Sequence, residues 1–182
     1  MCIIDDDLKL IYIAIPKTGT WSTEEYLEKY TSTNCLRFYK KRKKSDSAGS
    51  KHSTALEVKK VLKNYPDYYT IAVVRNPFDW YVSWYTYRQR ELSENPSNNL
   101  SFREYIIKHP MKEIIDWVTD EKGNIIVDSI LRYEDGLENE INKILLKKNI
   151  KPIYHMQRLN VSKKRCNKKY QDFYDKDTIA LV

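Results

Sequence analysis

Three short apolar runs, rich in β-branched residues, predict the strands of this chain. They lie at residues 8–15, 69–74 and 125–132. Runs that are apolar at nearly every position are typical of strands that are buried on both faces of a parallel sheet. The first run ends at Pro16 and the second leads directly into Arg75, so polar segments with candidate chemistry follow two of the predicted strands.

Segments with helical spacing follow these runs. Two capping boxes, at Thr54 and Ser101, mark helix starts, because a Ser or Thr placed three residues before a Glu satisfies the first amides of a helix. We predict helices over residues 21–30, 55–63, 77–92, 101–107 and 110–118, and one helix whose apolar face carries Leu137, Ile141, Ile144 and Leu145. This alternation predicts an α/β fold, with a mostly parallel central sheet flanked by helices.

The composition fits one compact domain of this kind. The chain has 182 residues, of which 41% are hydrophobic and 31% charged, and this length supports a single sizeable core. No apolar run approaches the roughly 18 residues of a membrane span, and the N-terminus lacks the pattern of a signal peptide. Three cysteines without CxxC spacing argue against a disulfide framework and a zinc site. We therefore expect a cytoplasmic protein.

The net charge of +7 is concentrated in two lysine-rich clusters. The first, residues 40–44, lies in a polar segment at residues 31–51 that we expect to be a long surface loop, and the second lies at residues 163–169. Such clusters attract polyanions, which include acidic glycans and multiply charged nucleotides. The alternative is a solvated surface that keeps the chain soluble.

The sequence Ile-Pro-Lys-Thr-Gly-Thr-Trp-Ser, at residues 15–22, joins the first predicted strand to the first predicted helix. Helix-start amides and the positive end of the helix dipole bind anions, Gly19 permits close backbone approach, and Lys17 adds a full charge. The segment therefore predicts a phosphate or sulfate site. It differs from the phosphate loop of nucleotide kinases because its glycine follows the lysine. A basic loop without a ligand is the alternative.

A second strand-to-helix junction, at residues 75–85, carries Arg75 and Ser83. Arg75 ends its strand, and Ser83 lies about two turns into the following helix. Ligands of open α/β sheets bind at the carboxyl ends of the strands, so both side chains could reach one anionic group. The alternative is structural, with Arg75 paired to a neighbouring carboxylate and Ser83 acting as a small packing residue.

Together, the two junctions resemble the carbohydrate-type sulfotransferases that use 3′-phosphoadenosine 5′-phosphosulfate (PAPS) and carry PKTGT and RNPxxRxxSxY motifs. The resemblance implies a fold similar to that of P-loop NTPases, and a 5′-phosphosulfate loop formed by Lys17, Thr18, Gly19, Thr20, Trp21 and Ser22. It also implies that Arg75 and Ser83 hold the 3′-phosphate. Trp80 departs from the pattern, since the family commonly has a second arginine there, and Trp21 stands where a small hydroxyl residue is frequent.

The resemblance extends over nearly the whole chain. It includes a Lys-His-x-x-Ala-x-Glu pattern at residues 51–57 and a Leu-Arg-Tyr-Glu-Asp stretch at residues 131–135. By likeness to the family, a distal loop closes over the adenosine 3′-phosphate with Asn160, Ser162 and Lys163. Family members carry a few more turns after the last matching segment, so we expect the C-terminal helix to be truncated or the chain to be a minimal version.

A histidine is the candidate general base, because an imidazole can take the proton of a hydroxyl near neutral pH. Of the three histidines, His52 matches a family position, whereas His109 and His155 are expected at the surface. The alternative bases are Glu57 and an acidic residue after Tyr133.

In the reaction that the resemblance implies, Lys17 stabilises the phosphate that leaves as 3′-phosphoadenosine 5′-phosphate (PAP), and no metal is needed. The acceptor presents a hydroxyl. A carbohydrate is favoured, and a small molecule, a lipid headgroup or a tyrosine peptide stays open. A nucleotide-dependent kinase and a non-enzymatic module that binds polyanions are the other functions to be tested. Nucleic acid is not the expected partner.

Overall fold

A computed structural model describes residues 2–31, 36–38, 52–91, 100–110, 113–159 and 168–182 of the chain. The chain divides into two compact units. The first comprises Met1–Val74 and Glu113–Leu159, and the second comprises Arg75–Lys112 and Asn160–Val182. Within the described ranges, no helix combines the length and the apolar character needed to cross a membrane.

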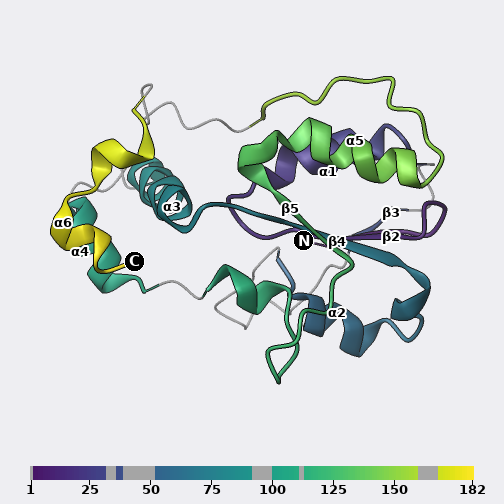
Figure 1. Ribbon diagram of the computed structural model, residues 1–182, viewed down its shortest axis with the longest axis horizontal. Coiled ribbons are helices and arrows are strands. Elements are labelled where there is room, and N and C mark those ends of the chain that lie inside the picture. The colour runs from purple at the N-terminus through teal and green to yellow at the C-terminus, as the bar shows by residue number, and fades with distance from the viewer. Residues whose placement is uncertain (1, 32–35, 39–51, 92–99, 111–112, 160–167) are drawn as a thin grey trace. The chain divides into compact units, whose positions relative to one another are not determined.

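A five-stranded sheet is the centre of the first unit (Figure 1). In spatial order its strands are β3 (Leu36–Phe38), β1 (Cys2–Asp5), β2 (Leu10–Ile13), β4 (Tyr69–Val74) and β5 (Ser129–Arg132). β4 is parallel to both of its neighbours, β2 and β5. β1 is antiparallel to β2 and to β3. The three predicted strands therefore form the parallel part of the sheet.

Helices cover both faces of this sheet (Figure 1). On one face lie α1 (Thr20–Glu28) and α5 (Leu137–Lys147), and on the other lies α2 (Ala55–Val61). Strands between two helical layers must be apolar on both sides, and every residue of β2 is buried. The predicted α/β fold with flanking helices is confirmed.

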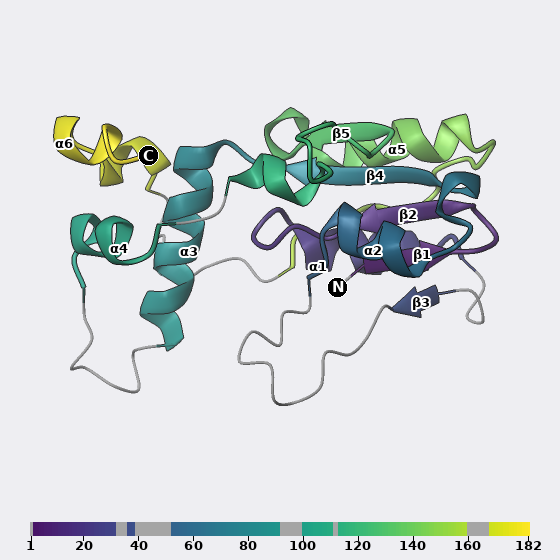
Figure 2. The same cartoon turned by 90° about the horizontal axis from the view of Figure 1, so that it is seen from below.

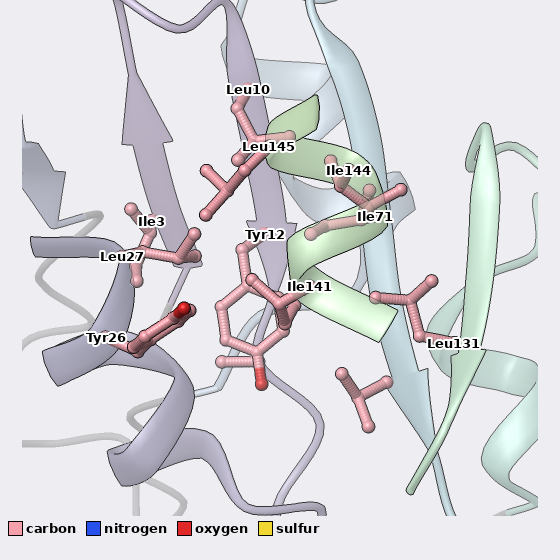
Figure 3. Packing of buried hydrophobic residues seen from close by; sticks show 12 residues of the cluster. Ile3, Leu10, Tyr12, Tyr26, Leu27, Ile71, Leu131, Ile141, Ile144 and Leu145 are labelled. Atoms are coloured by element: carbon pink, nitrogen blue, oxygen red, sulfur yellow. The ribbon is translucent and has the colours of Figure 1, made fainter. Parts of the chain in front are cut away.

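The main core lies between the sheet and the helix pair of α1 and α5. Figure 3 shows Tyr12 of β2 at its centre, close to Leu27 of α1 and Ile141 of α5. Ile141, Ile144 and Leu145 are all buried, as their helical spacing predicts. Each such side chain contributes roughly 1.5–3 kcal/mol by leaving water, so this cluster fixes α1, and with it the loop before α1, on the sheet.

Two strands at one side of the sheet were not predicted. β3 lies inside residues 31–51, so the prediction of an uninterrupted loop there is wrong over Leu36–Phe38. β1 reaches β2 through a tight turn in which Asp5 Oδ1 accepts hydrogen bonds from the backbone N–H groups of Asp7 and Leu8, at 3.0 and 2.9 Å. A short polar side chain that binds the backbone in this way favours a turn.

The segment before β5 also differs from the prediction. Instead of a strand from residue 125, Ile125 forms an isolated bridge with Thr119, and β5 begins only at Ser129. The backbone N–H of Thr70 donates to the Asp128 carboxylate at 2.6 Å, so a side chain occupies the ladder position at which the strand would otherwise begin.

The predicted helix over residues 110–118 is wrong in its described part. A short 3-10 turn, Ile114–Trp117, stands there. The chain then reverses at Asp120, whose Oδ1 accepts the backbone N–H groups of Lys122 and Asn124 at 2.9 and 2.8 Å. Across this turn, Val118 O accepts the backbone N–H of Ile126 at 2.9 Å, and Thr119 forms a bridge with Ile125.

The second unit contains α3 (Pro77–Glu91), α4 (Phe102–Lys108), a 3-10 turn at Tyr170–Phe173 and α6 (Lys176–Ile179). Figure 2 shows these elements from a second direction. Aromatic rings hold them together, with Phe102 4.9 Å from Tyr174 and 5.1 Å from Tyr85 between ring centroids. The predicted capping box at Ser101 is present, as is the one at Thr54 in the first unit.

Candidate active site

The loop between β2 and α1 contains two residues with positive φ. Lys17 and Gly19 both adopt left-handed conformations, with φ of 66° and 80°. A non-glycine residue in this region is strained, and such strain persists where the surrounding structure imposes it. Left-handed residues that alternate with others turn successive backbone N–H groups toward one concavity, which suits a phosphate or sulfate.

Gly19 is required at its position for two independent reasons. Its positive φ is costly for any residue with a Cβ. A Cβ built on Gly19 would also lie 2.8 Å from Leu137 Cδ2 and 3.1 Å from Tyr133 Cε2. The loop thus packs directly on the start of α5. Gly19 is also the N-cap of α1 and supplies no side-chain cap, so the first α1 amides are left to the backbone and to ligands.

Two buried threonine hydroxyls donate hydrogen bonds to backbone carbonyls of this loop. Thr18 is fully buried and donates its hydroxyl proton to Ile15 O at 2.8 Å. Thr23, also buried, donates to Gly19 O at 3.2 Å. Thr20 is buried as well, whereas the Trp21 side chain is 53% exposed. The structure therefore assigns the Thr18 side chain a bracing contact, and a bound anion would meet its backbone rather than its hydroxyl proton.

Ser22 connects the first turn of α1 to a distant segment. Its Oγ accepts the backbone N–H of Leu159 at 2.9 Å. Two residues beyond the end of α1, the hydroxyl of Tyr30 accepts the backbone N–H groups of Ile153 and Tyr154, both at 3.1 Å. Residues 153–159 are therefore fastened along the helix that begins at the loop.

His52 lies beside the strand end that opens the loop. Its Nδ1 is 2.6 Å from the carbonyl oxygen of Ala14, the residue that follows β2. A carbonyl can only accept, so Nδ1 carries the proton in this contact and the neutral imidazole keeps its lone pair on Nε2. The capping box of Thr54 and Glu57 fixes the chain two residues later, with Glu57 Oε2 3.0 Å from Thr54 N. His52 thus has the tautomer that a base acting through Nε2 needs.

The alternative bases have other surroundings. The Glu57 carboxylate caps α2, as described above. Glu134 and Asp135, which follow Tyr133, are exposed, and Asp135 lies 3.9 Å from Arg132. His155 is almost fully exposed and lies 3.2 Å from a carboxylate oxygen of Glu138. Among these side chains, His52 has the contact that ties it to the start of the loop.

The two strand ends that lead into the two junctions are neighbours. β2 and β4 run parallel, with Ile13 opposite Ala72, so their carboxyl ends lie at one edge of the sheet. β4 ends at Val74, and Arg75 is the next residue of the chain.

Arg75 forms an ion pair with Asp79, one helical turn along the chain. Nε and Nη2 lie 2.8 and 2.7 Å from the same carboxylate oxygen, Oδ2, and both side chains are largely buried, at 9% and 12% exposure. The carboxylate alternative considered from the sequence is therefore present. A guanidinium has five N–H donors in a fixed plane, and this pair orients the plane through two of them.

Asn76 begins the helix on which Ser83 lies. Its Oδ1 accepts the backbone N–H of Phe78 at 3.0 Å, as expected of a cap that precedes Pro77. Ser83 is half-buried, two turns into α3. Trp80, which replaces the second arginine of the family pattern, is buried at 4% exposure, so this position serves packing.

Asn160, Ser162 and Lys163 lie outside the described residues, as do the lysines at 40–44. Of the second basic cluster, Lys168 and Lys169 are described and exposed.

The sequence predicted a carboxylate partner for Arg75 only as an alternative, and the structure identifies it as Asp79, four residues later. Other groups that hold the candidate site were not predicted. Tyr133 and Leu137 contact Gly19, and Trp117 contacts His52, from positions remote in the sequence. No local pattern marks such contacts.

The sequence matches the model of the sulfotransferase family over residues 1–175. Neither the curated proteins nor the solved structures contain a match to this chain.

Proposed function

Because this chain belongs to the sulfotransferase family, we propose that it transfers the sulfuryl group of PAPS to a hydroxyl of an acceptor, and that the acceptor is a carbohydrate. Family membership supports sulfuryl transfer in general. The observation that carries the finer proposal is the loop at Lys17 and Gly19, with His52 bound to the residue that precedes it. This arrangement joins an anion cradle to a group able to accept a proton.

In the proposed reaction, the acceptor oxygen forms a bond to sulfur as the bond from sulfur to the 5′-phosphate oxygen breaks. His52 Nε2 receives the acceptor proton, and PAP leaves with the electron pair of the broken bond. Lys17 and the loop amides stabilise the charge on the leaving phosphate, while Arg75 and Ser83 anchor the 3′-phosphate. Positioning and charge stabilisation carry most of the catalysis in transfers of this kind.

The choice of a carbohydrate rests on the resemblance of the two motifs to the carbohydrate-type branch. The basic segment at residues 40–44 supports it, since five consecutive cationic side chains attract acidic glycans. A small molecule, lipid or peptide acceptor would use the same donor site, so the donor is tested first.

Thermal stabilisation by PAP, AMP and ATP distinguishes the candidate functions. A ligand at a hundred times its Kd adds about 2.7 kcal/mol of stability, which raises the Tm of a chain this long by roughly 5–10 °C. We expect PAP to give a shift of this size and AMP a much smaller one. A larger response to ATP would favour a kinase. A response to heparin alone would favour a polyanion-binding module.

Transfer itself is measured with PAPS labelled in the sulfuryl group and with pools of glycan, small-molecule and peptide acceptors. Lys17→Ala should lower turnover on the order of a hundredfold, because it removes a charge at the leaving phosphate. Lys147→Ala, on an exposed position of α5, removes the same charge elsewhere and should leave turnover unchanged. Equal rates for wild type and Lys17→Ala would contradict the assignment.

A further inference from the structure

His52 and Trp117 meet edge to face. Their ring centroids are 6.3 Å apart and their planes are inclined by 88°. This T-shaped arrangement is one that aromatic rings prefer to a face-to-face stack. Both side chains are half-buried. The His52 imidazole is thus held at Nδ1 by the Ala14 carbonyl and across its ring by the indole.

The backbone next to Trp117 is held by burial and by a hydrogen bond. It ends the 3-10 turn Ile114–Trp117, and the next residue, Val118, is fully buried. The carbonyl of Val118 accepts the backbone N–H of Ile126 at 2.9 Å. This hydrogen bond closes the hairpin that follows Trp117, so the indole projects from a segment that is anchored on its C-terminal side.

The hairpin is in turn tied to the segments around α2. The Tyr65 hydroxyl donates to Ile126 O at 2.9 Å. Lys60 of α2 forms an exposed ion pair with Glu121 at the hairpin tip. His52 precedes α2 and Trp117 precedes the hairpin, so these two contacts link the segments that carry the two rings.

We propose that Trp117 is a positioning residue that fixes the plane of the His52 imidazole. The hydrogen bond at Nδ1 fixes one point of the His52 ring, and rotation about that point would move Nε2. An indole packed at a right angle to the imidazole removes this freedom. The expected effect on catalysis rests on the proposed function. The effect on the orientation of the His52 ring rests on the ring contact alone.

The expected consequence is kinetic. A general base acts only when its nitrogen is within hydrogen-bond reach of the proton that it takes. Misplacement of a reacting group by about 1 Å can cost about a hundredfold in rate. Loss of the indole should therefore lower kcat by roughly tenfold to a hundredfold. Binding of PAP, which uses the loop and the arginine, should stay unchanged.

The geometric claim is tested by NMR on the intact chain, without any acceptor. Three histidines are present, so single His109→Gln and His155→Gln variants assign the His52 signals. Two-bond ¹H–¹⁵N correlations should show the Nδ1–H tautomer for neutral His52, and nuclear Overhauser effects should join its ring protons to those of Trp117. Absence of these effects in the folded wild type would overturn the proposal, even if every Trp117 variant failed to fold.

Substitutions test the role of the ring. Trp117→Phe keeps an aromatic edge and should retain the Nδ1–H tautomer and most of kcat. Trp117→Leu should broaden or shift the His52 ring signals and lower kcat at unchanged PAP affinity. Tyr154→Leu is the control, because Tyr154 makes a T-shaped contact with Tyr30, on the α1 face of the sheet. It should leave the His52 signals as they are.

The outcomes separate the two proposals. Wild-type His52 signals and kcat in Trp117→Leu would refute the positioning role while leaving sulfuryl transfer intact. If no sulfuryl transfer is found, the proposed function is refuted. If the His52 tautomer equilibrium is nevertheless altered in Trp117→Leu, the structural role of Trp117 is retained.

Discussion

Replacement of Gly19 by alanine tests whether the loop before α1 requires a residue without a Cβ at this position. The added Cβ would enter a left-handed residue, at φ of 80°, and would lie 2.8 Å from Leu137 Cδ2 and 3.1 Å from Tyr133 Cε2. Distances under 3 Å require something to move. Either the two side chains shift, or the loop lifts away from the start of α5.

The cost has two parts that a control can separate. The left-handed conformation costs an alanine about 1–2 kcal/mol. The crowding adds about 1–3 kcal/mol, as overpacking does elsewhere, and we expect the lower end because both neighbours are half-buried side chains. Gly123 has nearly the same φ, 82°, but nothing within 4 Å of its Cβ position. Gly123→Ala should therefore show the conformational cost alone.

Urea unfolding of the two variants measures the difference. We expect Gly19→Ala to lose about 2–4 kcal/mol of unfolding free energy and Gly123→Ala about half of that. PAP should raise the Tm of Gly123→Ala as it does the wild type, and that of Gly19→Ala much less. If both variants lost the same stability, the loop would not be packed on Tyr133 and Leu137 as described. If both kept the PAP response, the Gly19 backbone would not contact the donor.

Three other changes test contacts of the site and the sheet. Asp79→Asn should weaken PAP binding roughly tenfold with AMP binding unchanged, because the carboxylate that orients Arg75 becomes neutral; equal loss for both ligands would contradict this. Ser22→Ala should cost about 1 kcal/mol and speed amide exchange at Leu159, and unchanged exchange there would show that the hydrogen bond is absent. Burial raises the pKa of Asp5, so the folded chain binds more protons than the unfolded chain between the two pKa values. The contribution of Asp5 to stability should then fall as pH rises through its folded-state pKa, so the stability of the wild type relative to Asp5→Asn should decrease with rising pH in urea unfolding at several pH values.

Local rules account for the parts of the fold that were predicted. The strand at residues 69–74 was predicted with the bounds that β4 has, because its apolar run is interrupted sharply at Arg75. The capping boxes at Thr54 and Ser101 form as expected, because each involves residues only three apart. The conformation of the loop before α1 follows from the same kind of information, since Gly19 lies directly between a strand and a helix and adopts a positive φ there.

The rest depends on partners that lie elsewhere in the chain. β3 has three residues and pairs with β1 through the backbone, with Ile4 opposite Arg37. Backbone pairing of this kind leaves no pattern in the side chains, so the polar segment at residues 31–51 was predicted to be a loop. In the described part of the segment at 110–118, a 3-10 turn stands at Ile114–Trp117, and the next residues, Val118 and Thr119, pair with Ile126 and Ile125 across the turn at Asp120. In both cases tertiary pairing overrides a local preference.

The candidate site also combines residues that a local motif predicts with residues that no local pattern predicts. The residues proposed to meet the donor and acceptor, such as Lys17 and His52, come from short motifs, and a sequence can reveal them. The groups that hold them in place come from distant segments: Tyr133 beneath Gly19, and Trp117 across His52. A catalytic group contributes to rate only as far as its position is fixed. A chain could therefore keep both motifs and still lose activity. Substitutions at supporting residues such as Tyr133 and Trp117 would cause that loss.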